Sequence, residues 1–209
     1  MKLILLSSSE RKDSEIPYLL SMFEQGLPVY HLRKTKFSTR ELKNFIEEIP
    51  EKYHRRIVIH THHYLAAKFN LKGVYISRSH KKRKFRTWLR MKHLKIRKNN
   101  LQVSATFKSI EDILEPNTNY DYIFLSPVFD STSGNFQAGF SEYGLKLALK
   151  NSKFKVIARG GISADTIQKA HELGFSGVAF YSSIWKTKNP LQEFMKAKEK
   201  FNELKIPME

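Results

Sequence analysis

Short apolar runs alternate with helical patterns along almost the whole chain, and this alternation limits the fold more than any other feature. Parallel strands joined by helices give such a pattern, whereas hairpins and helical bundles do not. The runs predict strands at Leu3–Leu6, Val29–Leu32, Ile57–Ile59, Gly73–Ile76, Leu101–Ala105, Tyr122–Leu125, Lys155–Arg159 and Gly177–Tyr181. We therefore predict an α/β fold, a single (β/α)₈ TIM barrel that spans residues 1–209.

Helical segments between the predicted strands carry start and stop signals. Ser14 can cap a helix that Gly26 closes, and Ser38 with Glu41 has the pattern of a capping box. Pro190 suits the first turn of a terminal helix. The other helices are expected at Tyr64–Phe69, Ile110–Leu114 and Ser141–Leu149 and after Ser163. Each helix returns the chain to the same end of the sheet, as a parallel barrel requires.

Composition narrows the class of protein. The chain has 209 residues, of which 41% are hydrophobic, and this is enough to bury one full core. Cysteine is absent, which excludes disulfides, thiolate metal sites and cysteine catalysis. The apolar run Leu3–Leu6 is too short for a signal segment or a membrane span. We therefore expect a cytoplasmic protein without a membrane partner.

A glycine pair follows the seventh predicted strand. Gly160 and Gly161 have no β-carbon, so backbone N–H groups of this turn can approach an anion closely. Ile162 continues the loop, and Ser182 and Ser183 follow the eighth predicted strand. Loops after the last two strands of such a barrel often bind phosphate, frequently beside a short extra helix. A phosphate site is one interpretation, and an ordinary turn before a buried strand is the other.

Several motifs together resemble the thiamine phosphate synthase superfamily, which also contains the bacterial thiazole tautomerases. The resemblance covers nearly the whole chain. It rests on HLRK (His31–Lys34), GVYIS (Gly73–Ser77), LSPVFDSTSG (Leu125–Gly134), ARGGI (Ala158–Ile162) and GVAFYSSIW (Gly177–Trp185). It implies a (β/α)₈ barrel and a synthase that joins a pyrimidine pyrophosphate to a thiazole phosphate with Mg²⁺. The implied partner is thus a phosphorylated heterocyclic small molecule.

The resemblance also implies which residues form the site. The resemblance assigns phosphate binding to Gly160, Gly161, Ile162, Ser182 and Ser183. Binding of the pyrophosphate or pyrimidine side falls to His31, Arg33, His60, Ser131, Thr132 and Ser133. Two positions depart from the family pattern, because Gly134 and Thr35 stand where lysines are usual. Arg33 is the first of two residues to which we assign a catalytic role.

The expected Mg²⁺ ligands are missing. The family places an Asn-Asp pair after the third strand, where this chain has His60 and Thr61, and an acidic ligand after the fourth, where it has Arg78 and Ser79. Mg²⁺ needs oxygen ligands, so we predict no metal-binding residues, and Mg²⁺ is expected only if the synthase reaction is retained. Arginine side chains at strand ends, Arg33, Arg78 and Arg159, are candidates to supply the positive charge instead.

A histidine cluster and one lysine offer further chemistry. Histidines two residues apart on a strand share a face, so His60 and His62 could bind Zn²⁺ or Ni²⁺ if a third ligand were added. A polar cluster at the barrel mouth is the other interpretation. Lys108 occupies the position of a tautomerase histidine and is our second catalytic candidate, a proton-transfer group for a thiazole isomerase. A solvated lysine at a helix start is its alternative.

The segment Ser77–Asn100 is strongly basic. It contains eleven Lys and Arg residues, and no acidic residue lies between Lys52 and Ile110. We expect Trp88 and Leu89 to pack on the barrel while the basic residues face solvent. A solvated face, an electrostatic funnel for phosphorylated substrates and a nucleic-acid contact all fit this charge.

Three functions remain open from the sequence: a synthase, a tautomerase and a non-catalytic phosphate-ligand binder. Loss of the acidic positions weighs against the standard synthase reaction and does not separate the other two. No nucleic-acid-binding motif accompanies the basic segment, so we do not expect a nucleic-acid partner. A homodimer stays an open expectation.

Overall fold

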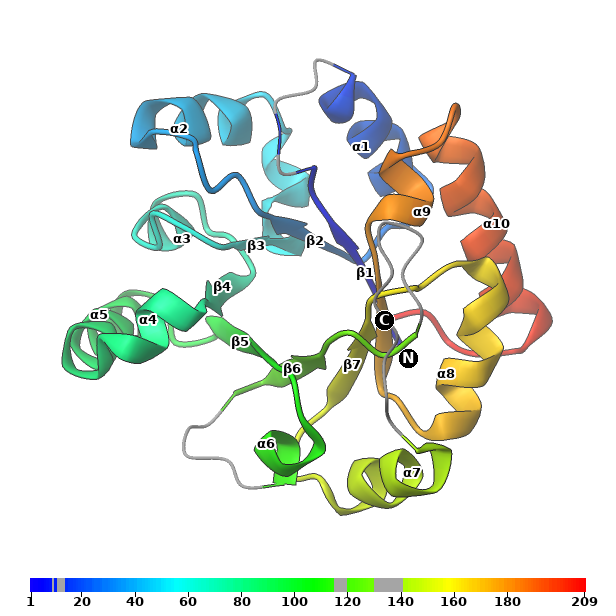
Figure 1. The fold of residues 1–209 in the computed structure, drawn as a ribbon. Helices are drawn as coiled ribbons and strands as arrows, with labels where there is room; N and C mark the ends of the chain where they lie inside the picture. Colours follow the sequence, from blue (N-terminus) through cyan, green and yellow to red (C-terminus); the bar gives the residue numbers. More distant parts are fainter. Residues whose placement is uncertain (9, 11–13, 115–119, 130–140) are drawn as a thin grey trace.

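The structure is a computed structural model that describes residues 1–8, 10, 14–114, 120–129 and 141–209. Eight parallel strands close into a barrel in sequence order, and helices surround them (Figure 1). The strands are β1 Lys2–Leu6, β2 Val29–Leu32, β3 Ile57–Ile59, β4 Gly73–Ile76, β5 Gln102–Phe107, β6 Tyr122–Leu125, β7 Val156–Arg159 and β8 Gly177–Phe180. The barrel closes where Leu5 of β1 pairs with Phe180 of β8. The predicted (β/α)₈ barrel is thereby confirmed.

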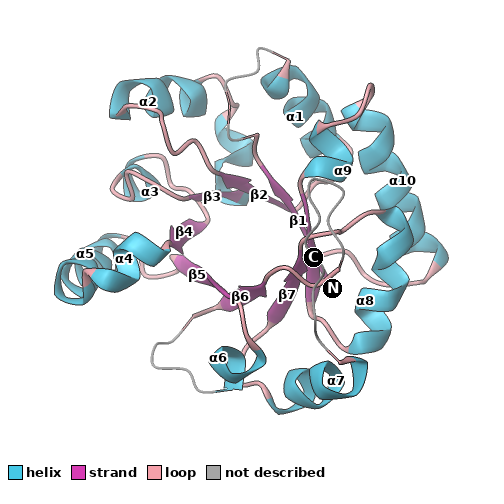
Figure 2. Cartoon of the chain, viewed as in Figure 1, coloured by secondary structure: helices cyan, strands magenta, loops and turns pink. Residues whose placement is uncertain are grey.

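Helices follow the strands and form the outer layer (Figure 2). They are α1 Glu15–Glu24, α2 Thr39–Glu47, α3 Leu65–Lys68, α4 Arg78–Lys82, α5 Lys84–Arg97, α6 Ile110–Leu114, α7 Glu142–Asn151, α8 Ile167–Leu173, α9 Ser182–Trp185 and α10 Pro190–Glu203, with 3₁₀ turns η1 Glu51–Arg56 and η2 Ala164–Thr166. No helix in the described part of the chain is long and apolar enough to cross a membrane.

Side chains alternate along the strands between the barrel interior and the helical layer, as the period of two in a strand requires. The interior cluster consists of Ile4, Leu6, Val29, Val58, Tyr122, Phe124, Ile157 and Ala179, with Tyr75 and Tyr181 packed against it. A larger cluster fills the space between strands and helices. Apolar packing therefore fixes the barrel, and polar groups are concentrated where the interior positions reach the strand ends.

The helix starts predicted from the sequence agree only in part with the structure. The capping box at Ser38 is present, because the Ser38 side chain accepts from the N–H of Glu41. Ser14 precedes α1 as expected but makes no side-chain cap hydrogen bond. The helix predicted to begin at Ser163 starts instead as the 3₁₀ turn η2, and α8 follows it. The loop after β7 therefore leads into a tight turn rather than directly into an α-helix.

The expected packing of α5 is wrong. Trp88 is 56% exposed and Leu89 is 52% exposed, whereas Leu94 is 2% exposed and packs on the barrel. Helix α5 has apolar residues on two sides, so its amphipathic pattern alone did not identify the buried side. The second side, with Trp88 and Leu89, faces solvent.

Candidate active site at the carboxyl end of the barrel

The residues predicted at strand ends lie on one rim. Because all eight strands are parallel and closed, their carboxyl ends meet at one face of the barrel. Arg33 follows β2, Ser77 follows β4 and Ser126 follows β6. His60 with Thr61 follows β3, and Arg159 with Gly160 ends β7. This face brings together the side chains from which a site can be built.

Two histidines and a tyrosine form a buried hydrogen-bonded chain below this rim. His31 Nδ1 lies 3.0 Å from His60 Nε2, and His31 Nε2 lies 2.6 Å from the Tyr122 hydroxyl. His31 is fully buried because it takes an inward position of β2, in register with Val58 of β3. These hydrogen bonds link β2, β6 and the residue that follows β3.

Burial keeps both histidines neutral. It lowers the pKa of His31 to about 3, and the positive charge of Arg159 contributes in the same direction. Burial also lowers the pKa of His60 well below its usual value, with smaller contributions from His31 and the nearby arginines. Burial likewise raises the pKa of the Tyr122 hydroxyl. The floor of the site is therefore uncharged at neutral pH.

Tyr75 connects this floor to the rim. Its ring stacks on the His60 imidazole with centroids 4.1 Å apart, and its hydroxyl donates to Thr106 Oγ1 at 2.9 Å. The ring is half-buried at an inward position of β4. His60 and Tyr75 thus present a stacked pair of aromatic rings, a surface suited to the face of a heterocycle.

Two arginines provide the positive charge at the rim. Burial lowers the pKa of Arg159; Tyr75 opposes this effect, and the charge of Arg33 adds to it. Among the residues that the structure describes, no carboxylate forms an ion pair with either arginine. Two positive charges at one rim without an acidic partner attract an anion. Arg78, the third predicted arginine, is exposed at the start of α4.

The loops after β7 and β8 are tied to each other. Gly160 and Gly161 have φ angles of 91° and 65°, a region that suits glycine. The Ser183 hydroxyl donates to the carbonyl of Ile162 at 2.6 Å, and the Trp185 indole N–H donates to the carbonyl of Leu6 at 2.7 Å. Within the described residues, the N–H groups of Gly161 and Ile162 have no hydrogen-bond acceptor. They are available to an anion.

The side chains near β3 and β4 do not suit Mg²⁺. Thr61 Oγ1 is buried and has no hydrogen-bond partner among the described groups, but it is a lone neutral oxygen. Ser79 Oγ is 2.9 Å from Ser77 Oγ. Over the described ranges of the chain, no three His, Asp or Glu side chains are grouped as metal ligands. A cation that prefers carboxylate oxygens lacks its usual ligands here.

Other predicted residues stand apart from this cluster. His62 has a φ angle of 50°, and its ring interacts with Thr39 Oγ1 at 2.9 Å and the Phe37 carbonyl at 3.2 Å. Because β3 ends at Ile59, strand alternation does not apply, and His60 and His62 do not share a face as expected. Lys108 is exposed just after β5. Ser131, Thr132 and Ser133 lie outside the described residues.

Tyr75, Thr106 and Tyr122 were missed by the sequence reasoning. The side chains of Tyr75 and Tyr122 pack in the barrel interior, and Thr106 accepts a hydrogen bond from the Tyr75 hydroxyl there. A polar side chain at an inward position near the carboxyl end of a strand was the signal that could have identified Tyr75 and Thr106. Tyr122 is the first residue of β6, and no such signal marks it.

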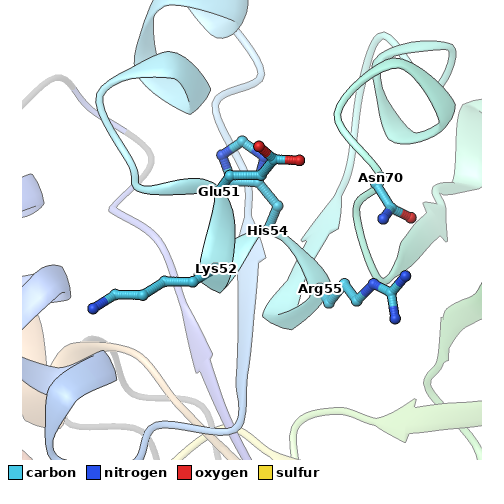
Figure 3. A pocket seen from close by; sticks show the side chains of 5 residues that line it. All are labelled: Glu51, Lys52, His54, Arg55 and Asn70. Atoms are coloured by element: carbon cyan, nitrogen blue, oxygen red, sulfur yellow. The ribbon is translucent and has the colours of Figure 1, made fainter.

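A surface pocket lies away from this face (Figure 3). Its walls are formed by Glu51, Lys52, His54, Arg55 and Asn70. The first four belong to the 3₁₀ turn that precedes β3, so the pocket lies near the amino end of that strand. His54 is buried there and is hydrogen-bonded to the carbonyls of Ile49 and Phe69. That end of a (β/α)₈ barrel usually serves stability, and we do not assign the site to this pocket.

Comparison with known proteins identifies the family. A family model described as thiamine monophosphate synthase matches residues 3–184. A thiamine-phosphate synthase of Methanobrevibacter smithii is 24% identical over 191 residues, which cover 90% of this chain and 88% of that protein.

Solved structures agree with this result. Thiamine phosphate pyrophosphorylase from Bacteroides thetaiotaomicron aligns with a TM-score of 0.76 and 27% identity, covering 97% of this chain and 98% of that one. The pyrophosphorylase from Pyrococcus furiosus aligns with a TM-score of 0.74 at 17% identity, covering 97% and 96%, and supports the fold alone. Since the family model spans most of its length, this chain belongs to the thiamine monophosphate synthase family.

Proposed function

We propose that this chain is a synthase-like enzyme that binds a thiazole phosphate or thiamine phosphate type of ligand at the carboxyl end of the barrel. Its anion site is based on arginine rather than on a metal ion. The main support is that Arg33 follows β2 and Arg159 ends β7 at the same rim, and that neither guanidinium group has a carboxylate partner in the described part of the chain. Family membership supports the reaction class.

Each part of the site has a distinct task in this proposal. The N–H groups of Gly161 and Ile162 bind the phosphate of the thiazole side. Arg33 and Arg159 bind the more highly charged pyrophosphate, because guanidinium groups pair with phosphate oxygens through two parallel hydrogen bonds. The heterocycle lies over His60 and Tyr75, whose stacked rings and neutral state favour an aromatic, uncharged group.

The arginine-based site predicts binding without a divalent cation. The test is calorimetric titration of thiazole phosphate and thiamine phosphate with Mg²⁺ or with chelator, at low and moderate salt. We expect nearly equal affinity with and without Mg²⁺, and weaker binding at higher salt. A strong Mg²⁺ requirement for binding would overturn the arginine-based site and show that other residues supply metal ligands.

Catalysis is tested separately by release of pyrophosphate from a pyrimidine pyrophosphate and thiazole phosphate. Turnover would support the synthase function. Ligand binding without turnover would instead support a non-catalytic phosphate-ligand binder. The tautomerase has less support, because its candidate proton-transfer group Lys108 is an exposed side chain. The tautomerase function would gain support if the purified protein isomerised the thiazole and the Lys108→Met variant did not.

A further inference from the structure

Helix α5 presents an apolar stripe to solvent. Phe85, Trp88, Leu89 and Ile96 are 73%, 56%, 52% and 76% exposed. They follow one another at helical spacing, so they share one side of the helix. Phe85 and Trp88 stack with ring centroids 6.1 Å apart, and Lys92 lies over the Trp88 ring at 5.4 Å. Phe85, Trp88 and Leu89 therefore form an apolar cluster on this side of the helix, and Ile96 lies two turns further along the same side.

The opposite side of α5 already attaches the helix to the barrel. Leu94 is buried, and Thr87 and Met91, which lie seven and three residues before it, are half-buried. The exposed stripe is thus not required to hold α5 in place. In Figure 1, α4 and α5 lie beside each other in the outer layer, outside β4 and β5.

Basic side chains flank the stripe on both sides. Arg86, Arg90 and Arg97 recur on one flank, and Lys84 and Lys95 lie on the other; all five are exposed. No acidic residue occurs between Lys52 and Ile110. A second copy of this chain would bring like charges together at a two-fold interface, which disfavours self-association through this surface. A nucleic acid would use the charges but leave Leu89 and Ile96 without partners.

We propose that α5 binds the surface of an anionic phospholipid bilayer. Phe85, Trp88, Leu89 and Ile96 insert among the lipid chains near the headgroups, and the flanking arginines and lysines contact lipid phosphates. This combination of a basic flank with Trp, Phe and Leu on one side is the physical pattern of helices that lie in the interface plane. Sequence analysis led us to expect no membrane partner, but that expectation considered only spanning and signal segments.

The test is flotation of the full chain with vesicles of phosphatidylcholine alone or with added phosphatidylglycerol. We expect binding only to the anionic vesicles. Phe85→Ser with Ile96→Ser should weaken it by at least roughly tenfold, because the apolar insertion is lost. Arg86→Gln with Arg90→Gln should weaken it by roughly 30-fold. All four residues are exposed, so the variants should fold, which circular dichroism and melting temperature verify.

Matched controls test whether vesicle binding depends on this side of α5 or only on the overall charge of +17. Tyr143→Ser removes a side chain that is 79% exposed on α7, beside the acidic Glu142, and should leave binding unchanged. Lys153→Gln with Lys155→Gln removes two exposed charges elsewhere and should have a small effect. Equal binding by the Phe85/Ile96 variant and the unmodified chain would overturn the proposal, as would a dimer or an RNA complex that depends on the stripe.

Discussion

Gly160 lies so close to Pro127 that a β-carbon on Gly160 would be 2.8 Å from Cβ of Pro127 and 2.9 Å from its Cα. The loop after β7 thus rests directly on the loop after β6. Gly160 also has a φ angle of 91°, a backbone conformation that suits glycine. Two independent constraints, backbone conformation and space, act on one residue at the edge of the site.

Gly160→Ala should lower the free energy of unfolding by about 2–4 kcal/mol, because it adds a steric clash to backbone strain. Gly174→Ala is the matched control, since Gly174 has a φ angle of 96° but an added β-carbon there would lie 3.9 Å from Cβ of Leu149, an ordinary contact distance. The control should lose only the strain contribution, about 1 kcal/mol. Urea unfolding of both variants measures the difference, and equal losses would refute the clash.

Gly161→Val should abolish binding of phosphate ligands. The φ angle of 65° disfavours a branched side chain, and the added methyl groups would stand beside the N–H groups available to the anion. Calorimetry with thiazole phosphate checks the binding, and a melting curve checks that the fold persists. Unchanged affinity would remove this loop from the proposed site.

Arg159→Met should weaken binding of inorganic pyrophosphate by roughly 10- to 100-fold, because it removes charge-assisted hydrogen bonds worth about 1.5–3 kcal/mol. Arg78→Met removes a charge that is exposed on α4 and serves as the control, with little expected change. A similar loss in both variants would mean that general attraction, and not the Arg33–Arg159 pair, holds the anion.

The buried histidines should make stability depend on pH. The pKa of His31 is about 3 in the folded chain, below the unfolded value of about 6.5. The unfolded chain therefore gains a proton first, so stability is full above about pH 6.5 and falls as the pH drops toward 3. Urea midpoints from pH 7 to pH 4 should fall less steeply in His31→Gln than in the unmodified chain. His171→Gln, at an exposed position on α8, should keep the original slope.

Lys34→Met should be strongly destabilising, because it leaves Glu15 buried without its cation. Both side chains of this ion pair are fully buried, and Glu15 also accepts from the Tyr30 hydroxyl at 2.7 Å. Breaking a buried pair costs about 3–5 kcal/mol, so the melting temperature should fall well below that of the double variant Glu15→Gln with Lys34→Met. If the double variant melts no higher than Lys34→Met, the unpaired carboxylate is not the cause.

The positions of the strands could be predicted from sequence because buried parallel strands consist of short apolar runs. The predicted bounds at Val29–Leu32, Gly73–Ile76 and Tyr122–Leu125 agree with the structure. The first strand begins one residue earlier than predicted, and the fifth extends to Phe107. Strand ends depend on the pairing partner, which a single run does not specify.

The site was harder to predict because its contacts join residues far apart in sequence. The pattern HLRK identified His31 and Arg33, but nothing local indicated that His31 would meet Tyr122, 91 positions later. His62 was misplaced because strand alternation was applied beyond Ile59, where both the predicted strand and β3 end. Trp88 and Leu89 were misplaced because α5 has two apolar sides, and only packing decides between them.

The chain contains two tryptophans, and they lie in opposite surroundings. Trp185 is 4% exposed at the end of α9, the short helix that carries Ser182 and Ser183, whereas Trp88 is 56% exposed on α5. The intrinsic fluorescence of the protein therefore contains two reporters, one beside the loops after β7 and β8 and one on the exposed side of α5. A quencher in solvent should reach Trp88 first, so ligand addition and vesicle addition can be followed as separate optical signals in the same sample.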